Sequence, residues 1–287
     1  MEQMKGTLIP IGGNEDKGIA VDEIYPLDFI HDGILYNVVK EAGGTKSNIV
    51  VIPTASSIPV EVGESYYKAF AALGCENISI LDIRSKQDSE KKSSIDLIKN
   101  ADCVMFSGGN QSKITDKIGG TTIHEILLDR YKNDENFVIA GTSAGAMAMS
   151  NEMISGGSAS EAFFKGAVTM YEGLGLIPEL IIDTHFIKRG RFGRQAEAVA
   201  KFPLLIGIGL AEDTGMVIKN GKDCTVIGSG MAIVFDGSSL THNNEGILEE
   251  ATPMSLANLK VHVLSNSDQF DIKNRTVKVL PIEAPFI

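Results

Sequence analysis

The chain has 287 residues, of which 43% are hydrophobic and 22% charged, and its formal net charge at pH 7 is −11. These values are typical of a globular protein with a large core, and the acidic excess excludes general nucleic-acid binding, which needs a basic face. No leader-like segment follows Met1, and no apolar run approaches the length of a membrane span, so we expect a cytoplasmic protein without a membrane partner. The three cysteines lack C-x-x-C spacing, which predicts free, buried thiols.

The first half of the chain alternates between strand and helix patterns. Apolar runs predict strands at 7–11, 48–52, 78–83, 101–106 and 137–140, and helical spacing predicts helices at 33–42, 64–72, 124–131 and 144–149. Strands separated by helices indicate an α/β fold with a mainly parallel sheet covered on both faces. Loops that follow such strands meet at one crevice, and three of them here are rich in glycine, at 12–15, 107–111 and 141–145.

The second half is richer in strands. We predict strands at 180–183, 204–210, 216–219, 223–227, 232–235, 259–264 and 276–280, and a helix-like stretch at 188–201. Asn220-Gly221 predicts a type I′ hairpin turn between two of these strands. No linker divides the chain, so we expect one domain over 1–287 with a β-rich C-terminal extension at 236–287, whose role the sequence leaves open.

The sequence at 141–145, Gly-Thr-Ser-Ala-Gly, fits the pattern G-x-S-x-G between a buried strand and a predicted helix. A sharp strand-to-helix turn exposes the central serine, and Gly141 and Gly145 have no Cβ atoms to clash in it. The helix N-terminus behind Ser143 presents its positive dipole end to any oxyanion formed there. Ser143 is therefore a candidate nucleophile. The alternative is a tight turn with a capping serine.

A nucleophilic serine needs a base, and the base needs an acid to orient it. His185 is the candidate base because it follows a buried strand and has charged residues nearby in the sequence. Of the other histidines, His124 lies in a predicted surface helix, and the remaining three have no polar neighbours at a strand end. Glu212 and Asp213 follow the next buried strand, from which either carboxylate could reach His185. The order serine, histidine, acid disfavours an α/β-hydrolase, in which the acid precedes the histidine.

Two further features concern the substrate. The backbone N–H groups of Gly109 and Ala144 are the expected oxyanion hole, because both belong to glycine-rich loops that border the serine. The segment 188–194 carries four cations, namely Lys188, Arg189, Arg191 and Arg194. Arginine binds carboxylates through two parallel hydrogen bonds, so the segment predicts a carboxylate-rich substrate. A solvated helix face is the alternative.

Several motifs in order resemble the cyanophycinases, of the serine peptidase family that also contains aspartyl dipeptidase (peptidase E). The motifs lie at 11–17, 52–57, 108–111, 141–146, 183–194 and 209–214, within a similarity over about 6–235. The resemblance implies a flavodoxin-like three-layer sandwich related to class I glutamine amidotransferases, and a homodimer. It also implies a serine exopeptidase that cleaves cyanophycin, a poly-aspartate chain with arginine on each β-carboxyl, into β-Asp-Arg dipeptides.

Carried over by position, the resemblance makes Ser143 the nucleophile, His185 the base and Glu212 the acid. It places in the substrate site the residues Gln111, Asp183, Thr184, Arg189, Arg191 and Arg194. Thr184 departs from the family pattern, in which a glutamine precedes the histidine, so the pocket is expected to lack the hydrogen bonds of that amide.

Three other functions compete with a cyanophycinase. The first is an aspartyl or isoaspartyl dipeptidase that acts on short peptides, although the run of arginines favours the polymer. The second is a non-catalytic anion-binding protein, which would be expected to have lost Ser143 or His185. The third is a glutamine-amidotransferase-type transferase, which would need a cysteine at position 143. The spacing of the histidines implies no metal, and nothing in the sequence implies a cofactor.

Overall fold

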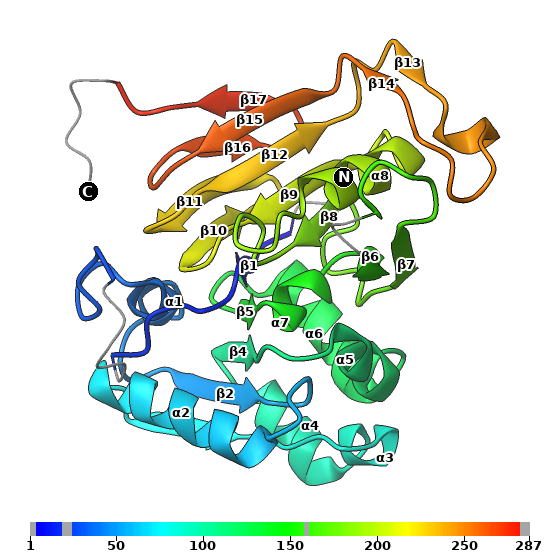
Figure 1. Ribbon diagram of the computed structural model, residues 1–287. Helices are drawn as coiled ribbons and strands as arrows, with labels where there is room; N and C mark the ends of the chain where they lie inside the picture. Colours follow the sequence, from blue (N-terminus) through cyan, green and yellow to red (C-terminus); the bar gives the residue numbers. More distant parts are fainter. Residues whose placement is uncertain (1–3, 19–24, 158–160, 282–287) are drawn as a thin grey trace.

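A nine-stranded sheet runs through the protein (Figure 1). The computed structural model describes residues 4–18, 25–157 and 161–281. In sheet order the strands are β17 (Thr276–Lys278), β16 (Gln269–Asp271), β11 (Asp223–Gly228), β10 (Thr214–Lys219), β1 (Thr7–Ile11), β5 (Val138–Thr142), β4 (Cys103–Phe106), β2 (Asn48–Ile52) and β3 (Asn77–Ile80). From β1 to β3 neighbouring strands are parallel, and from β1 to β17 they are antiparallel.

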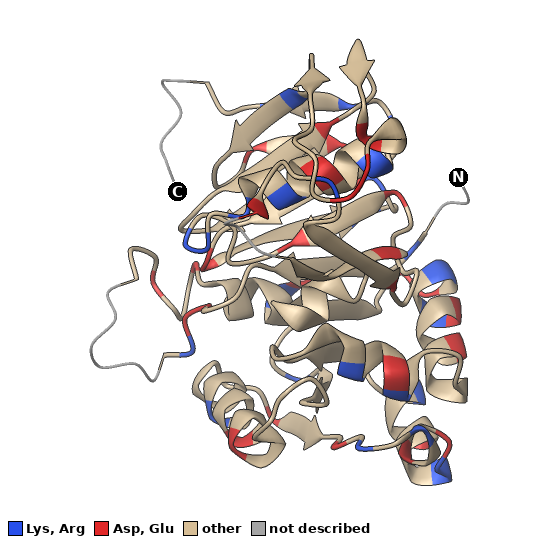
Figure 2. Cartoon of the chain, turned by 45° about the vertical axis from the view of Figure 1, so that its right-hand side comes forward, with Lys and Arg blue, Asp and Glu red and all other residues tan. Residues whose placement is uncertain are grey.

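Within the parallel half of the sheet, β1, β5 and β4 are buried on both faces, as their apolar runs predict, whereas the edge strand β3 is partly exposed. Helices α1 (Ile34–Glu41) and α2 (Pro59–Ala72) pack on the face that carries Val51. The opposite face, which carries Val50, packs against α4 (Lys92–Lys99), α5 (Gln111–Ile118), α6 (Thr122–Asn133) and α7 (Ala144–Met147). Figure 2 shows that charged residues lie mainly on the helices and loops. The strands carry few charges, which is consistent with their place in the core.

A second sheet has the order β15 (Lys260–Leu264), β12 (Ala232–Asp236), β9 (Ile206–Leu210) and β8 (Leu180–Asp183). Strands β8 and β9 are parallel neighbours, and β12 and β15 join them antiparallel. One face of this sheet shares a core with the large sheet, and α8 (Phe192–Lys201) packs on the other face. The apolar runs in the sequence predicted these strands but did not indicate that they form a second sheet.

Shorter elements complete the described chain. They are α3 (Lys86–Ser89), the pair β6 (Glu152–Gly157) and β7 (Val168–Glu172), the pair β13 (His242–Asn243) and β14 (Leu256–Ala257), and the 3₁₀-helix η2 (Glu245–Ile247). The last six residues of the predicted extension, 282–287, lie outside the described residues. No helix in the described part of the chain is long and apolar enough to cross a bilayer.

Most predicted elements are present with errors at their ends, whereas helices α3, α4 and α5 were not predicted. Helix α2 begins at Pro59 rather than 64, because proline is well suited to the first turn of a helix. Helix α8 begins at Phe192 rather than 188, because Gly190 has a φ of 59° and interrupts the helical backbone. Helix α7 ends at Met147, two residues early. Asn220 and Gly221 both have positive φ, as the predicted turn requires. The three cysteines are buried free thiols, as predicted.

Candidate active site

Ser143 occupies the sharp turn between β5 and α7, with φ 50° and ψ −108°. The turn leaves no room for side chains on its flanking glycines. A Cβ atom on Gly141 would lie 2.6 Å from the carbonyl carbon of Gly145, and one on Gly145 would lie 2.7 Å from Cβ of Phe106. Both glycines are thus required for the close passage of strand and helix, as their spacing predicts.

His185 contacts Ser143, and Glu212 contacts His185. The two residues come together because they follow β8 and β9, which are parallel neighbours. The Nε2 atom of His185 lies 3.1 Å from Ser143 Oγ, and its Nδ1 atom lies 2.7 Å from Glu212 Oε1. An ionised carboxylate can only accept a hydrogen bond, so Nδ1–H donates to Glu212 and Nε2 accepts from the hydroxyl of Ser143. The structure therefore places an alcohol, an imidazole and a carboxylate in one hydrogen-bonded line.

The two adjacent acidic residues point in different directions. Glu212 contacts His185 through one oxygen and accepts from Lys188 Nζ at 3.0 Å through the other. Asp213 is buried with a φ of 47°, and its carboxylate accepts from Ser229 Oγ at 2.5 Å and from the backbone N–H of Asp16 at 3.2 Å. Of the two carboxylates left open by the sequence, Glu212 is the one that contacts the imidazole.

The environment of the pair favours a neutral imidazole beside a charged carboxylate. Burial, together with the nearby cations Arg189 and Arg191, lowers the pKa of His185 below 6.5, although the hydrogen bond to Glu212 opposes the shift. Burial alone would raise the pKa of Glu212, but the hydrogen bonds with His185 and Lys188 outweigh it and lower that pKa. At neutral pH the imidazole is free to accept a proton from Ser143.

The N–H of Ala144 directly follows Ser143 in the chain, and the loop that contains Gly109 lies nearby. A Cβ atom added to Gly108 would lie 3.4 Å from Ser143 Cβ, so the 107–111 loop lies against the serine. Within the described residues, neither the N–H of Gly109 nor that of Ala144 has a hydrogen-bond partner. Unpartnered donors beside a nucleophile are suited to a developing oxyanion. The roles expected of both N–H groups stay predictions.

The chain matches the model of peptidase family S51 over residues 32–226. The chain belongs to peptidase family S51. It is 36% identical over 274 residues to the cyanophycinase of Trichormus variabilis, covering 95% of this chain and 88% of that protein, and 33% identical over 272 residues to that of Geminocystis herdmanii, covering 95% and 96%. A peptidase from an acI-B1 Actinobacterium shares the fold at 19% identity, with a TM-score of 0.65, covering 94% of this chain and 98% of that one.

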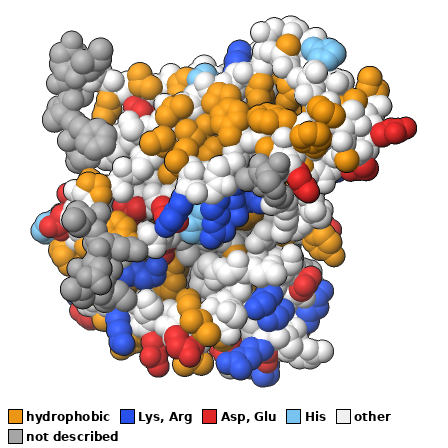
Figure 3. Space-filling model, in the orientation of Figure 1, with side chains coloured by type: hydrophobic (Ala, Val, Ile, Leu, Met, Phe, Trp, Pro, Cys, Tyr) orange, Lys and Arg blue, Asp and Glu red, His pale blue; other side chains and the backbone are white. Residues whose placement is uncertain are grey.

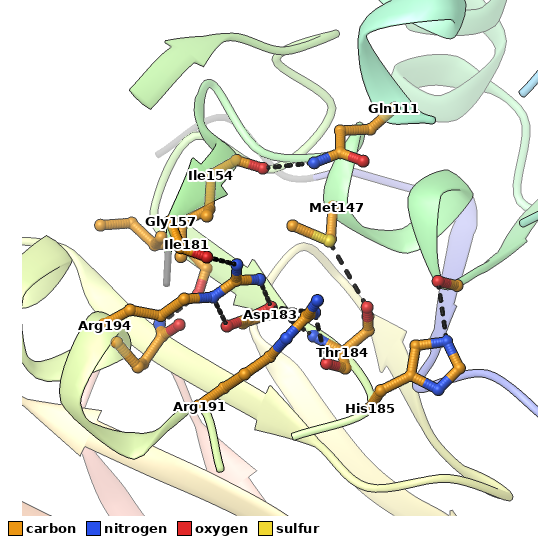
Figure 4. A network of polar contacts seen from close by, with 12 residues as sticks. Gln111, Met147, Ile154, Gly157, Ile181, Asp183, Thr184, His185, Arg191 and Arg194 are labelled. Atoms are coloured by element: carbon orange, nitrogen blue, oxygen red, sulfur yellow. Dashed lines mark hydrogen bonds and ion pairs between the residues drawn. The ribbon is translucent and has the colours of Figure 1, made fainter. Parts of the chain in front are cut away.

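Several residues that were predicted to line the substrate site of this S51 member instead bind one another. The carboxylate of Asp183 is fully buried and accepts from Arg194 Nε at 2.6 Å and Nη2 at 2.5 Å, and from Arg191 Nη1 at 2.9 Å (Figure 4). Arg194 is only 4% exposed. In this conformation Asp183 and Arg194 form a buried ion pair rather than a surface that receives substrate carboxylates.

The remaining predicted contacts divide into buried and accessible groups. The side chain of Thr184 is fully buried and donates to Met147 Sδ at 3.4 Å, so it lies beneath the surface that a substrate would contact. Gln111 is half-buried and donates to the carbonyl of Ile154 at 2.8 Å (Figure 4). Arg189 is exposed, and Arg191 is half-buried above Asp183. The substrate-binding roles of Gln111, Arg189 and Arg191 stay predictions.

The ion pair predicts a large stability effect. Asp183→Ala is expected to lower the free energy of unfolding by about 3–5 kcal/mol, because it leaves the buried guanidinium of Arg194 without its carboxylate. Asp96→Ala, which breaks a well exposed pair with Lys92 in α4, is expected to change it by no more than about 0.5 kcal/mol. Urea denaturation measures both values. Equal effects of the two substitutions would contradict the structural role of Asp183.

Sequence reasoning missed one buried residue near the site. Glu15 belongs to the first glycine-rich loop, yet only the glycines of that loop were considered. Its carboxylate is 2% exposed and accepts from the hydroxyl of Thr142, the residue before Ser143. The signal that could have found it is a carboxylate in the short glycine-rich loop that follows a buried strand. Within the described residues no group of three or more His, Cys, Asp or Glu side chains could hold a metal ion.

Proposed function

We propose that the protein is a serine exopeptidase that hydrolyses aspartate-backbone bonds of cyanophycin and releases β-Asp-Arg dipeptides. The observation that carries the proposal is the hydrogen-bonded line from Ser143 through His185 to Glu212. Membership of family S51 and the name cyanophycinase of relatives that match along nearly their whole length support the substrate.

In the proposed mechanism Ser143 Oγ attacks the carbonyl carbon of the scissile bond while His185 Nε2 takes the hydroxyl proton. Glu212 holds the imidazole in the required tautomer and stabilises its positive charge. His185 then gives the proton to the leaving amine as the C–N bond breaks. A water molecule, deprotonated by His185, attacks the acyl-enzyme and releases the acid product and the free hydroxyl of Ser143.

The negative oxygen of each tetrahedral intermediate needs donors that are already in place. We assign this role to the N–H groups of Gly109 and Ala144. The part of the chain that the structure describes offers neither group another hydrogen-bond partner, which supports the assignment. Arg189 is the exposed cation best placed to receive a carboxylate of the substrate, because Arg194 is bound to Asp183 and Lys188 to Glu212. Arg191 is half-buried and already bound to Asp183, and we assign it a contact with the substrate beside Arg189.

Substrate choice can be tested directly. The purified protein is incubated with cyanophycin and, separately, with β-Asp-Arg and α-aspartyl dipeptides, and the products are identified by mass spectrometry. Release of β-Asp-Arg from the polymer supports the proposal. Cleavage of dipeptides alone would select the aspartyl dipeptidase.

The pH dependence follows from the state of the base. Only neutral His185 can accept the proton of Ser143, so kcat/KM is expected to fall as the pH drops through the pKa of His185, with a midpoint below 6.5. Arg189→Gln removes a cation that lowers this pKa and should raise the midpoint. The measurement is the pH profile of kcat/KM for both proteins. A wild-type midpoint above 6.5, or a midpoint that falls in the variant, would contradict the assignment of the base.

We further propose that the chain is one flavodoxin-like domain of three layers with a β-rich extension, that it is cytoplasmic, and that it forms a homodimer. An exposed apolar face supports the dimer. Phe192, Val261 and Val263 are 45%, 36% and 63% exposed on the outer side of the second sheet. Val263 and Val261 lie beside Ile233 and Phe235 on the neighbouring strand, and the ring of Phe192 contacts that of Phe235. Figure 3 shows apolar side chains gathered on the upper part of this face, above a group of Lys and Arg side chains.

The dimer predicts a change of mass in solution. The wild-type protein is expected to have twice the 30.7 kDa mass of the chain by light scattering. Val263→Asp should give a monomer, because it places a charge on the apolar face. Val60→Asp, at an exposed apolar position of α2, should not change the mass. Wild-type monomers, or equal effects of both substitutions, would exclude this face as the dimer contact.

A further inference from the structure

The loop that follows β1 contacts all three loops that carry the proposed triad. We call residues 11–17 the β1 loop. Three successive carbonyls of the β1 loop each accept a backbone N–H from a different loop: Ile11 O from Ser143 at 2.8 Å, Gly12 O from His185 at 2.8 Å, and Gly13 O from Asp213, the neighbour of Glu212, at 2.9 Å. The β1 loop is thus the common support of segments that are far apart in the sequence.

The three donor residues share an uncommon backbone conformation. Ser143, His185 and Asp213 have φ angles of 50°, 48° and 47°, in the left-handed region that residues other than glycine rarely adopt. Such conformations persist only where surrounding contacts over-determine them. The carbonyls of the β1 loop supply one such contact to each residue, so they stabilise the conformation in which the side chains of the site converge.

Gly13 and Glu15 of the β1 loop make two further contacts with the site. Gly13 has a φ of 105°, and a Cβ atom there would lie 2.4 Å from Cε1 of His185, so the imidazole lies directly against the loop backbone. Glu15 Oε2 accepts from Thr142 Oγ1 at 2.5 Å, and Glu15 Oε1 accepts from Tyr66 Oη at 2.5 Å. Lys17 Nζ lies 2.8 Å from Oε1.

Glu15 is charged despite its burial. Desolvation would raise the pKa of the carboxyl, but the charge of Lys17 and hydrogen bonds from Lys17, Thr142 and Tyr66 outweigh it and lower that pKa. A buried charge with every contact satisfied holds its partners more firmly than a neutral group would. Of those partners, Thr142 is covalently joined to Ser143.

We propose that Glu15 is a positioning residue for the serine: its carboxylate fixes Thr142 and thereby sets the direction of Ser143 Oγ toward His185. This proposal rests on the proposed function of Ser143. The β1 loop then holds the site twice, by backbone bonds to all three loops and by one side-chain bond to the residue before the nucleophile. A misplacement of about 1 Å in a catalytic group can reduce the rate by 10²-fold.

Two hydroxyl deletions on the same carboxylate provide a matched test. Thr142→Val and Tyr66→Phe each remove one hydroxyl that donates to Glu15 at the same distance, but only Thr142 adjoins the serine. We expect Thr142→Val to lower kcat on cyanophycin by about 10- to 100-fold with little change in KM. Tyr66→Phe should change kcat by less than about three-fold, and Thr142→Ser, which keeps the hydroxyl, should retain most of the activity.

The rate at which a fluorophosphonate labels the serine separates positioning from stability, because it reports the reactivity of the hydroxyl without the polymer. The labelling rate should fall together with kcat in Thr142→Val and stay near the wild-type rate in Tyr66→Phe. Thermal unfolding curves should show that every protein is folded at the temperature of the assay. Equal losses in the two variants, or no loss in Thr142→Val, would overturn the positioning role. If the wild-type protein neither reacts with the probe nor cleaves the polymer, the proposed function itself fails instead.

Discussion

Ser143→Ala is expected to lower kcat on cyanophycin by about 10⁴- to 10⁶-fold, the largest effect of any single substitution we predict. The reason is that the proposed covalent intermediate forms on the hydroxyl of Ser143, which His185 Nε2 contacts directly at 3.1 Å. The residual rate would come from the N–H groups of Gly109 and Ala144 and from substrate binding alone. Release of β-Asp-Arg, followed by mass spectrometry, measures the loss.

The substitution should leave the fold intact, which makes it a clean test. Alanine removes a hydroxyl from a half-exposed position and is expected to change the free energy of unfolding by less than about 1 kcal/mol. The far-ultraviolet circular dichroism and the urea midpoint check this. A folded Ser143→Ala protein with more than a tenth of the wild-type kcat would exclude a serine mechanism.

Glu212→Gln is the second large effect, with an expected loss in kcat of about 10³- to 10⁴-fold, because an amide lacks the charge that stabilises the imidazolium and can stabilise the wrong tautomer of the ring. Asp213→Asn is the matched control, since its carboxylate contacts Ser229 and Asp16 rather than the imidazole. We expect that substitution to lower kcat by less than about 10-fold.

The kinetics of the two variants can be compared at several pH values. Glu212→Gln removes a hydrogen bond that raises the pKa of His185, so the acid midpoint of kcat/KM should move further below 6.5. Asp213→Asn should leave it nearly unchanged. If Asp213→Asn causes the larger loss, the acid has been assigned to the wrong residue.

Much of the fold follows from local patterns. The strands at 7–11, 48–52 and 180–183 were predicted to the residue, because each is a short apolar run bounded by glycine, proline or polar residues. The β6–β7 pair was missed because Ser155, Gly156 and Gly157 interrupt any apolar alternation. The division into two sheets depends on which strands pair across long distances, and local patterns carry little information on such contacts.

The candidate site was predictable where a residue type and its place in the chain pointed to the same chemistry. Ser143 and His185 follow buried strands, so both were found. The residue pattern alone left the acid open between the adjacent Glu212 and Asp213, and only the family resemblance pointed to Glu212. In the structure Asp213 has a positive φ, and its carboxylate contacts Ser229 and Asp16. Arg194 was expected to bind substrate, but its buried bond to Asp183 depends on how the turn before α8 folds back on β8.

Labelling with a serine-directed fluorophosphonate tests the central claim most directly. The probe is added in small steps to the wild-type protein, the labelled peptide is identified by mass spectrometry, and the remaining release of β-Asp-Arg from cyanophycin is measured after each step. We predict one label per chain, on Ser143, and a loss of activity in direct proportion to the labelled fraction. Full activity in a fully labelled protein, or a label on another residue that accompanies the loss, would contradict the account.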